Sequence, residues 1–136
     1  MSYPALDGYT CIVRTAAGKI LTSDAHGIRP PLLWLRSSAK PGEDPDLLRG
    51  AVVSDKVIGK AAALLFCHGG VRSIWAEKMS EAAVEFLDSQ GIAYAYDELV
   101  PAILNREGTG LCPMEQKVLT VDDPAQAFRI FDEIIG

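Results

Sequence analysis

The stretch Leu47–Leu65, LLRGAVVSDKVIGKAAALL, decides how the rest of the chain is interpreted. Residues 48–53 form a short run rich in apolar and β-branched side chains, which is typical of a buried strand. Ser54 and Asp55 then offer side-chain oxygens of the kind that cap a helix, and residues 56–66 are apolar on most faces. The stretch therefore predicts a strand followed directly by a helix.

The same order of elements recurs immediately downstream. Residues 71–77 predict a strand, and residues 80–90 predict an amphipathic helix that begins at Ser80 and is stopped by Gly91. Residues 92–96 predict another strand. Because the connections are short, this alternation predicts parallel strands joined by right-handed crossovers.

Further elements flank this alternating core. Residues 9–14 and 18–23 predict the two strands of a hairpin. Residues 30–38 predict a helix, residues 98–104 a short helix and residues 124–135 a last helix. Together the elements predict an α/β domain of three layers, α/β/α, with a five-stranded mixed sheet and helices on both faces. We expect one domain over residues 1–136, with a core at about 9–97 and a C-terminal extension at 98–136.

Two motifs in this chain resemble those of a known protein family. The first is Asp55-Lys56-x-x-Gly59-Lys60-Ala-Ala, and the second is Cys112-Pro-Met-Glu115. They resemble a small bacterial and archaeal family of unknown function with a cytidine-deaminase-like fold, and the likeness runs from about Tyr9 to Phe131. The resemblance implies a fold and supplies no reaction.

The sequence argues against the zinc chemistry of the cytidine deaminases. Those enzymes place His-x-Glu or Cys-x-Glu at one helix start and Pro-Cys-x-x-Cys at the next. The corresponding starts, residues 54–57 and 78–82, contain neither histidine nor cysteine. We therefore expect no metal site, no cofactor and no zinc-dependent deamination.

Composition excludes several other classes of protein. The chain has 13 Lys and Arg against 18 Asp and Glu, a net charge of −5, and no basic block, which argues against a nucleic-acid partner. The longest apolar run, residues 61–67, is far shorter than the roughly 20 residues that span a bilayer, so no membrane partner is expected. The N-terminus lacks a signal region, and Cys11, Cys67 and Cys112 are widely spaced. These features predict a reducing, cytoplasmic location.

The expected start of the helix at residues 56–66 is the first candidate site. This start would bring free backbone N–H groups and two ammonium groups together, an arrangement that suits a phosphate or carboxylate. The residues concerned are Ser54, Asp55, Lys56, Gly59 and Lys60. In an open α/β sheet this end also faces the usual ligand crevice. The alternative is an ordinary capped helix with solvated lysines.

The segment Gly110–Gln116, GLCPMEQ, is the second candidate site. Pro113 suits a first helical position, which would place Cys112 at the N-cap, where a thiol is a better nucleophile. Glu115 lies at the capping-box position of the same helix. Just upstream, Gly108 and Gly110 would let loop N–H groups turn towards an anion. The alternatives are a structural cysteine and an ordinary loop.

These sites support three functional hypotheses. The first is binding of a small anionic, nucleotide-like molecule without zinc, between residues 55–60 and 108–115, with Asp55, Cys112 and Glu115 as candidate catalytic groups. The second is a thiol or sulfur-transfer enzyme that uses Cys112. The third is a non-catalytic regulatory or interaction domain, and self-association is compatible with all three.

Overall fold

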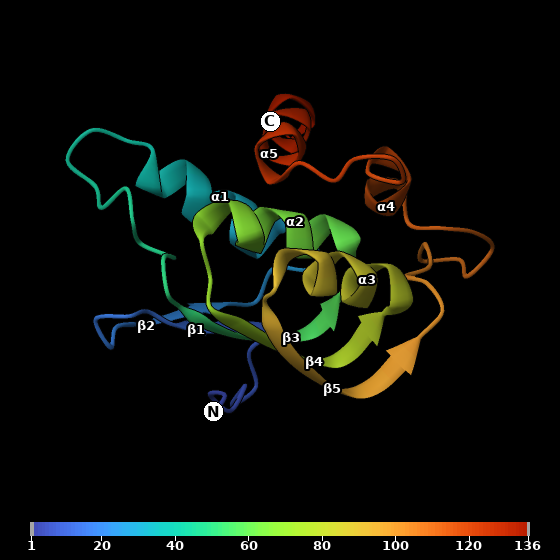
Figure 1. The fold of residues 1–136 in the computed structure, drawn as a ribbon, viewed down its shortest axis with the longest axis horizontal. Coiled ribbons are helices and arrows are strands. Elements are labelled where there is room, and N and C mark those ends of the chain that lie inside the picture. Colours follow the sequence, from blue (N-terminus) through green and yellow to red (C-terminus); the bar gives the residue numbers. More distant parts are fainter. Residues whose placement is uncertain (1, 136) are drawn as a thin grey trace.

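The computed structural model of the chain describes residues 2–135. Strands and helices alternate through most of that range (Figure 1). The strands are β1 Cys11–Arg14, β2 Ile20–Ser23, β3 Val52–Ile58, β4 Ser73–Ser80 and β5 Ala93–Val100. The helices are α1 Arg29–Ser38, α2 Lys60–Gly69, α3 Glu81–Gln90, α4 Pro113–Lys117 and α5 Pro124–Ile134.

The strands form one five-stranded sheet in the order β2-β1-β3-β4-β5. β1 runs antiparallel to both β2 and β3, whereas β3, β4 and β5 are parallel to one another. The expected α/β class, the mixed five-stranded sheet and the parallel core are therefore confirmed.

The layers differ from the expected α/β/α arrangement. Figure 1 shows the helices on one side of the sheet, with α1, α2 and α3 next to the strands and α5 stacked on α2. The reason lies in the topology: each right-handed crossover moves in the same direction across the sheet, so its helix falls on the same face. The prediction of helices on both faces is wrong. On the opposite face the N-terminal segment lies against the strands, where the Ser54 hydroxyl donates to the Pro4 carbonyl at 2.7 Å.

The position of α2 explains its composition. The helix lies between the sheet and α5, and residues 61–66 are all buried, none more than 3% exposed. A helix covered on two sides has no solvated stripe, which is why this segment is apolar on most faces.

Within the described residues, no helix is long and apolar enough to cross a membrane.

The boundary between β3 and α2 falls later than the sequence predicted. β3 continues through Ile58, and α2 begins at Lys60 with Gly59 as its N-cap. Val57 and Ile58 are β-branched and pair with Lys78 and Met79 of β4, so the strand extends through residues expected to be helical. Ser54 and Asp55 therefore lie in a strand and do not cap a helix.

β5 also passes its expected end. It runs to Val100, across the proposed boundary at 97/98, and residues 98–104 form no helix. The parallel pairing places Lys78 beside Glu98 and Ser80 beside Val100, so a long β4 provides a partner for these residues. The expected start of α3 at Ser80 is confirmed, because the Ser80 hydroxyl accepts from Ala83 N as the N-cap. At the start of α5, the Asp123 carboxylate accepts from Ala125 N.

Candidate functional site

A cleft of about 490 Å³ lies between α3 and the segment 101–122, which we call the C-terminal segment. It opens where the parallel strands end, next to the starts of α2 and α3, the usual position for ligands in open α/β sheets. Its lining combines apolar walls with a few polar groups. The lining residues are Lys60, Ser80, Ala82, Glu85, Phe86, Ser89, Pro101, Ala102, Ile103, Leu111, Glu115, Leu119 and Asp122.

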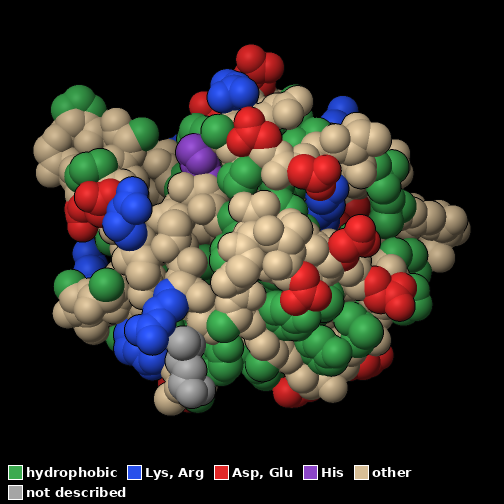
Figure 2. Space-filling model, viewed as in Figure 1, with side chains coloured by type: hydrophobic (Ala, Val, Ile, Leu, Met, Phe, Trp, Pro, Cys, Tyr) green, Lys and Arg blue, Asp and Glu red, His purple; other side chains and the backbone are tan. Residues whose placement is uncertain are grey.

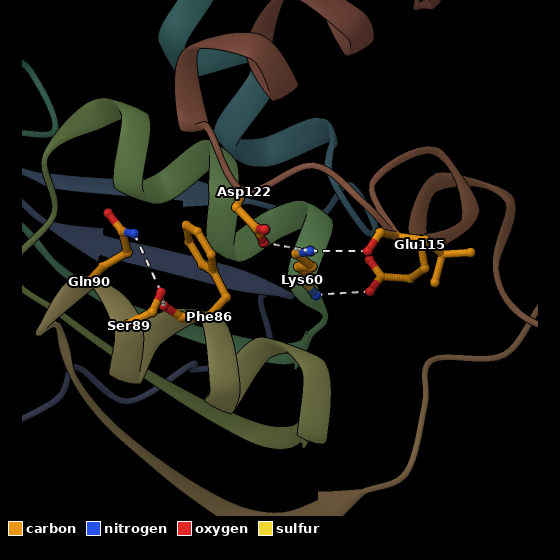
Figure 3. Close-up of polar contacts among 7 residues, drawn as sticks. Lys60, Phe86, Ser89, Gln90, Glu115 and Asp122 are labelled. Carbon is orange, nitrogen blue, oxygen red and sulfur yellow. Dashed lines mark hydrogen bonds and ion pairs between the residues drawn. The ribbon is translucent and has the colours of Figure 1, made fainter.

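Glu115 joins the C-terminal segment to the start of α2. One carboxylate oxygen accepts from Lys60 N at 2.8 Å and the other from Ala61 N at 2.9 Å (Figure 3). The side chain is only 8% exposed. It therefore satisfies two of the backbone donors that a helix start leaves free, at the positive end of the helix dipole. Burial raises the pKa of Glu115, and the two N–H groups and the Lys60 charge oppose that rise.

The expected role of Glu115 was wrong in one respect. The capping-box spacing predicted that it caps its own helix, α4, whereas its carboxylate caps α2, 55 residues earlier in the chain. The anion position at the start of α2 is thus occupied by the protein's own carboxylate.

Lys60 forms a second link between α2 and the C-terminal segment. Its Nζ lies 2.9 Å from Asp122 Oδ1 (Figure 3). The same ammonium group donates to the Leu119 carbonyl at 3.4 Å. The Lys60 side chain is 12% exposed, whereas that of Asp122 is 80% exposed. The ammonium group is therefore already paired, at the edge of the cleft.

Gly59 leaves the space that the Glu115 carboxylate occupies. A Cβ at this position would lie 2.6–2.7 Å from the carboxylate atoms of Glu115. Gly59→Ala is therefore expected to lower the free energy of unfolding by about 2 kcal/mol, because one of the two groups must move. Urea denaturation measures the effect. In a Glu115→Ala background the cost should fall to the roughly 0.5 kcal/mol of an alanine at an N-cap. An equal cost in both backgrounds would show that the contact is not the cause.

Asp55 lies away from the cleft, on the helix-facing side of β3 opposite Cys11. It is 5% exposed; Oδ1 accepts from Val57 N at 3.3 Å, and Oδ2 has no hydrogen-bond partner within the described residues. Burial raises the pKa of Asp55 to about 7, although the Val57 N–H group favours the ionised form. Burial, together with the neighbouring Asp55 charge, also raises the pKa of the Cys11 thiol.

The predicted cluster at residues 54–60 is divided by the structure. Ser54 faces the N-terminal segment on the other side of the sheet, and Lys56 is exposed on β3. Only Gly59 and Lys60 lie at the start of α2. A strand alternates its side chains between two faces, so residues expected on one helix turn point in opposite directions.

The loop at residues 105–110 uses its own N–H groups internally. The Asn105 backbone carbonyl accepts from Gly108 N at 3.1 Å, and its side-chain oxygen accepts from Thr109 N at 3.0 Å. Asn105 N in turn donates to the Gly110 carbonyl at 2.9 Å. Neither Gly108 nor Gly110 lines the cleft, so the structure does not bring the predicted anion-binding loop to it.

Cys112 is the N-cap of α4, as predicted, with Pro113 at the first helical position. Its side chain is half-buried and does not line the cleft. The three residues expected to act in catalysis therefore do not converge: Asp55 lies on the sheet, Glu115 binds α2 and Cys112 starts α4. Among residues 2–135, no three His, Cys, Asp or Glu side chains are grouped so that they could hold a metal.

Sequence reasoning missed the α3 wall of the cleft. Ala82, Glu85, Phe86 and Ser89 recur at intervals of three and four residues, which places them on one face of α3. The spacing was visible, but a mixed face of this kind normally faces solvent. Only the C-terminal segment, which crosses in front of it, turns this face into a wall.

Comparisons with known proteins give a consistent picture of the family. A family described as a domain of unknown function, DUF1893, matches residues 5–135. A crystal structure of a DUF1893 family protein from Thermotoga maritima is 28% identical, with a TM-score of 0.77, and the match covers 92% of this chain and 80% of that chain. No protein with a curated description matches. The likeness to cytidine deaminase remains an expectation from the sequence. The matched family covers nearly the whole chain, and the protein belongs to the DUF1893 family.

Proposed function

We propose that the protein binds a small organic molecule, without a metal ion, in the cleft between α3 and the C-terminal segment. The observation that carries the proposal is the lining: apolar walls on which a few polar groups converge, around about 490 Å³. Ligand sites in proteins typically have this composition and a volume of roughly 300–1,000 Å³.

The two walls of the cleft are held in place by contacts that involve no ligand. Phe86 of α3 is 3% exposed and belongs to the hydrophobic core. The opposite wall is fixed to α2 through Glu115 and through the ion pair of Lys60 with Asp122. A site whose walls are held by the fold needs little ordering when a ligand binds, which favours affinity.

Part of the evidence for the expected anionic, nucleotide-like ligand is still present in the structure. Lys60 lies in the cleft, where its ammonium group would attract a phosphate. The other supports are missing, since Lys56 lies on β3 and the free N–H groups of α2 are bound by Glu115. Nucleotides therefore belong in the ligand set that tests the proposal, next to neutral and cationic compounds.

The test is a titration of the isotope-labelled protein with that ligand set, followed by amide proton–nitrogen spectra. We expect at least one compound to shift the amide signals of residues around the cleft, such as Phe86, Ser89 and Ile103. Ala82→Trp, at an exposed position of α3 on the cleft wall, should abolish those shifts by filling the space. Ala17→Trp, at an exposed position of the β1–β2 turn, is the matched control and should preserve them.

Two results would contradict the proposal. One is that no compound of any charge shifts signals around the cleft. The other is that the shifts persist in Ala82→Trp, which would place the binding elsewhere on the molecule.

A further inference from the structure

We propose that the ligand of this cleft is an amine: a positively charged, hydrogen-bond-donating group on an apolar body. This inference rests on the proposed function, because it assigns a chemical class to the molecule bound in the same cleft. The charges, the hydrogen-bonding groups and the apolar walls of the lining each support it.

The charged side chains that line the cleft are mostly acidic. They are Glu85, Glu115 and Asp122, against Lys60 as the single cation in the lining. Lys60 is already paired with Asp122, and Glu115 is bound to the start of α2. Glu85 is exposed and makes no hydrogen bond or ion pair within residues 2–135. A cationic ligand can therefore bind this carboxylate without breaking a hydrogen bond or ion pair of the folded protein.

The surroundings of the cleft are acidic as well. Figure 2 shows Asp and Glu side chains gathered over the part of the surface where α3 and β5 lie. These two elements carry Glu81, Asp88, Asp97 and Glu98 in addition to Glu85, and no Lys or Arg. Fields from many like charges add, so this side of the molecule attracts cations and repels phosphates and carboxylates.

The uncharged polar groups of the lining also call for a donor. The Ser89 hydroxyl donates to the Phe86 carbonyl at 2.6 Å and accepts one long contact from Gln90 Nε2 at 3.4 Å, which leaves one lone pair free to accept. The Leu119 carbonyl has one long contact, at 3.4 Å, with Lys60. The Ser80 oxygen accepts from Ala83 N at 3.1 Å and is buried under the helix start. Acceptors therefore predominate among the groups that remain available, and an ammonium group supplies only donors.

The apolar part of the lining defines the rest of the ligand. Phe86, Ile103 and Leu111 form walls of the cleft, and Leu119 lies at its edge with 65% of its surface exposed. An exposed large apolar side chain beside a cleft gains by being covered. A ligand with a ring or short alkyl body next to its amine would cover it.

The test compares phenethylamine, phenethyl alcohol and hydrocinnamate, which share a phenyl ring on a short chain and differ in charge. Adenosine monophosphate is added as the anionic nucleotide. Each is titrated into the full chain at millimolar concentration, and binding is followed by the amide signals around the cleft. We expect phenethylamine to bind most tightly and hydrocinnamate and the nucleotide most weakly.

Glu85→Gln removes the accessible charge and keeps the shape of the side chain. It should weaken phenethylamine by about two- to fivefold, the range of an exposed ion pair, and leave phenethyl alcohol unchanged. Glu81→Gln is the matched control, because Glu81 lies on the same helix but outside the lining, and it should change neither.

Every other outcome has a defined meaning. If the alcohol, hydrocinnamate or the nucleotide shifts the cleft signals as strongly as the amine, the amine inference is wrong while binding in the cleft stands. Equal losses in Glu85→Gln and Glu81→Gln also overturn it, because the ammonium group would then respond to the general field of the acidic surface and not to a carboxylate in the cleft. If none of the four compounds shifts those signals, the inference falls, and the broader ligand set with Ala82→Trp then decides the proposed function separately.

Discussion

Replacing Glu115 with alanine is expected to lower the free energy of unfolding by about 3 kcal/mol. The change removes a carboxylate that accepts from Lys60 N and Ala61 N and is 8% exposed. Hydrogen bonds to a charged group contribute roughly 1.5–3 kcal/mol each, and water that enters from the cleft would compensate part of the loss. The C-terminal segment also loses its strongest contact with α2, so the cleft should open. Urea denaturation measures the effect.

A graded series separates this contact from a general effect of mutation. Glu115→Gln keeps one acceptor oxygen and should fall between the wild type and alanine. Glu107→Ala, in the exposed loop at residues 105–110, should leave stability within about 0.5 kcal/mol of the wild type. If Glu115→Ala were as mild as Glu107→Ala, the carboxylate would not hold the segment in place.

Replacing Asp55 with asparagine is expected to stabilise the protein above about pH 7, by up to about 4 kcal/mol. Burial raises the pKa of this carboxyl from its ordinary 3.8 to about 7. Between those values the folded protein keeps a proton that the unfolded chain has lost, so the wild type loses stability as pH rises through this window. Asparagine does not titrate, and its side-chain oxygen can still accept from Val57 N. Below about pH 4 the two proteins should be nearly equally stable.

The measurement is urea denaturation of both proteins from about pH 4 to about pH 8. The difference between the two curves isolates Asp55 from other groups, such as His68, whose pKa burial lowers. Asp24→Asn, an exposed carboxylate after β2, is the control and should run parallel to the wild type. A parallel profile for Asp55→Asn would mean that Asp55 is ionised in the folded protein.

Local patterns predicted the elements whose causes are local. The Ser80 cap and the Gly91 stop of α3 depend on residues within a few positions of one another, and the apolar run of α2 is visible in adjacent residues. The sequence of strands and helices then followed, and with it the mixed sheet. Right-handed crossovers also determine which side of the sheet each helix occupies. The sequence pattern was therefore sufficient to predict helices on one face, and the prediction of helices on both faces was avoidable.

Contacts between distant residues could not be predicted from local spacing. β3 and β5 extend because β4 is long enough to pair with their ends, and the pairing partners are about 20 residues apart in the chain. The hydrogen bond between Lys60 N and the Glu115 carboxylate joins residues that are 55 positions apart in the chain. The position of Glu115 within α4 was equally compatible with a cap on its own helix. The cleft itself exists only because the C-terminal segment crosses the mixed face of α3.

Amide hydrogen exchange at Lys60 and Ala61 tests most directly how this cleft is built. First-turn amides of a helix have no partner within the helix and normally exchange fast. Here we predict that both are protected in the wild type, because each donates to the Glu115 carboxylate. In Glu115→Ala both should exchange rapidly, while Leu64 and Leu65, farther along α2, stay protected. Rapid exchange of Lys60 and Ala61 in the wild type would contradict the docking of the C-terminal segment on α2, and with it the cleft.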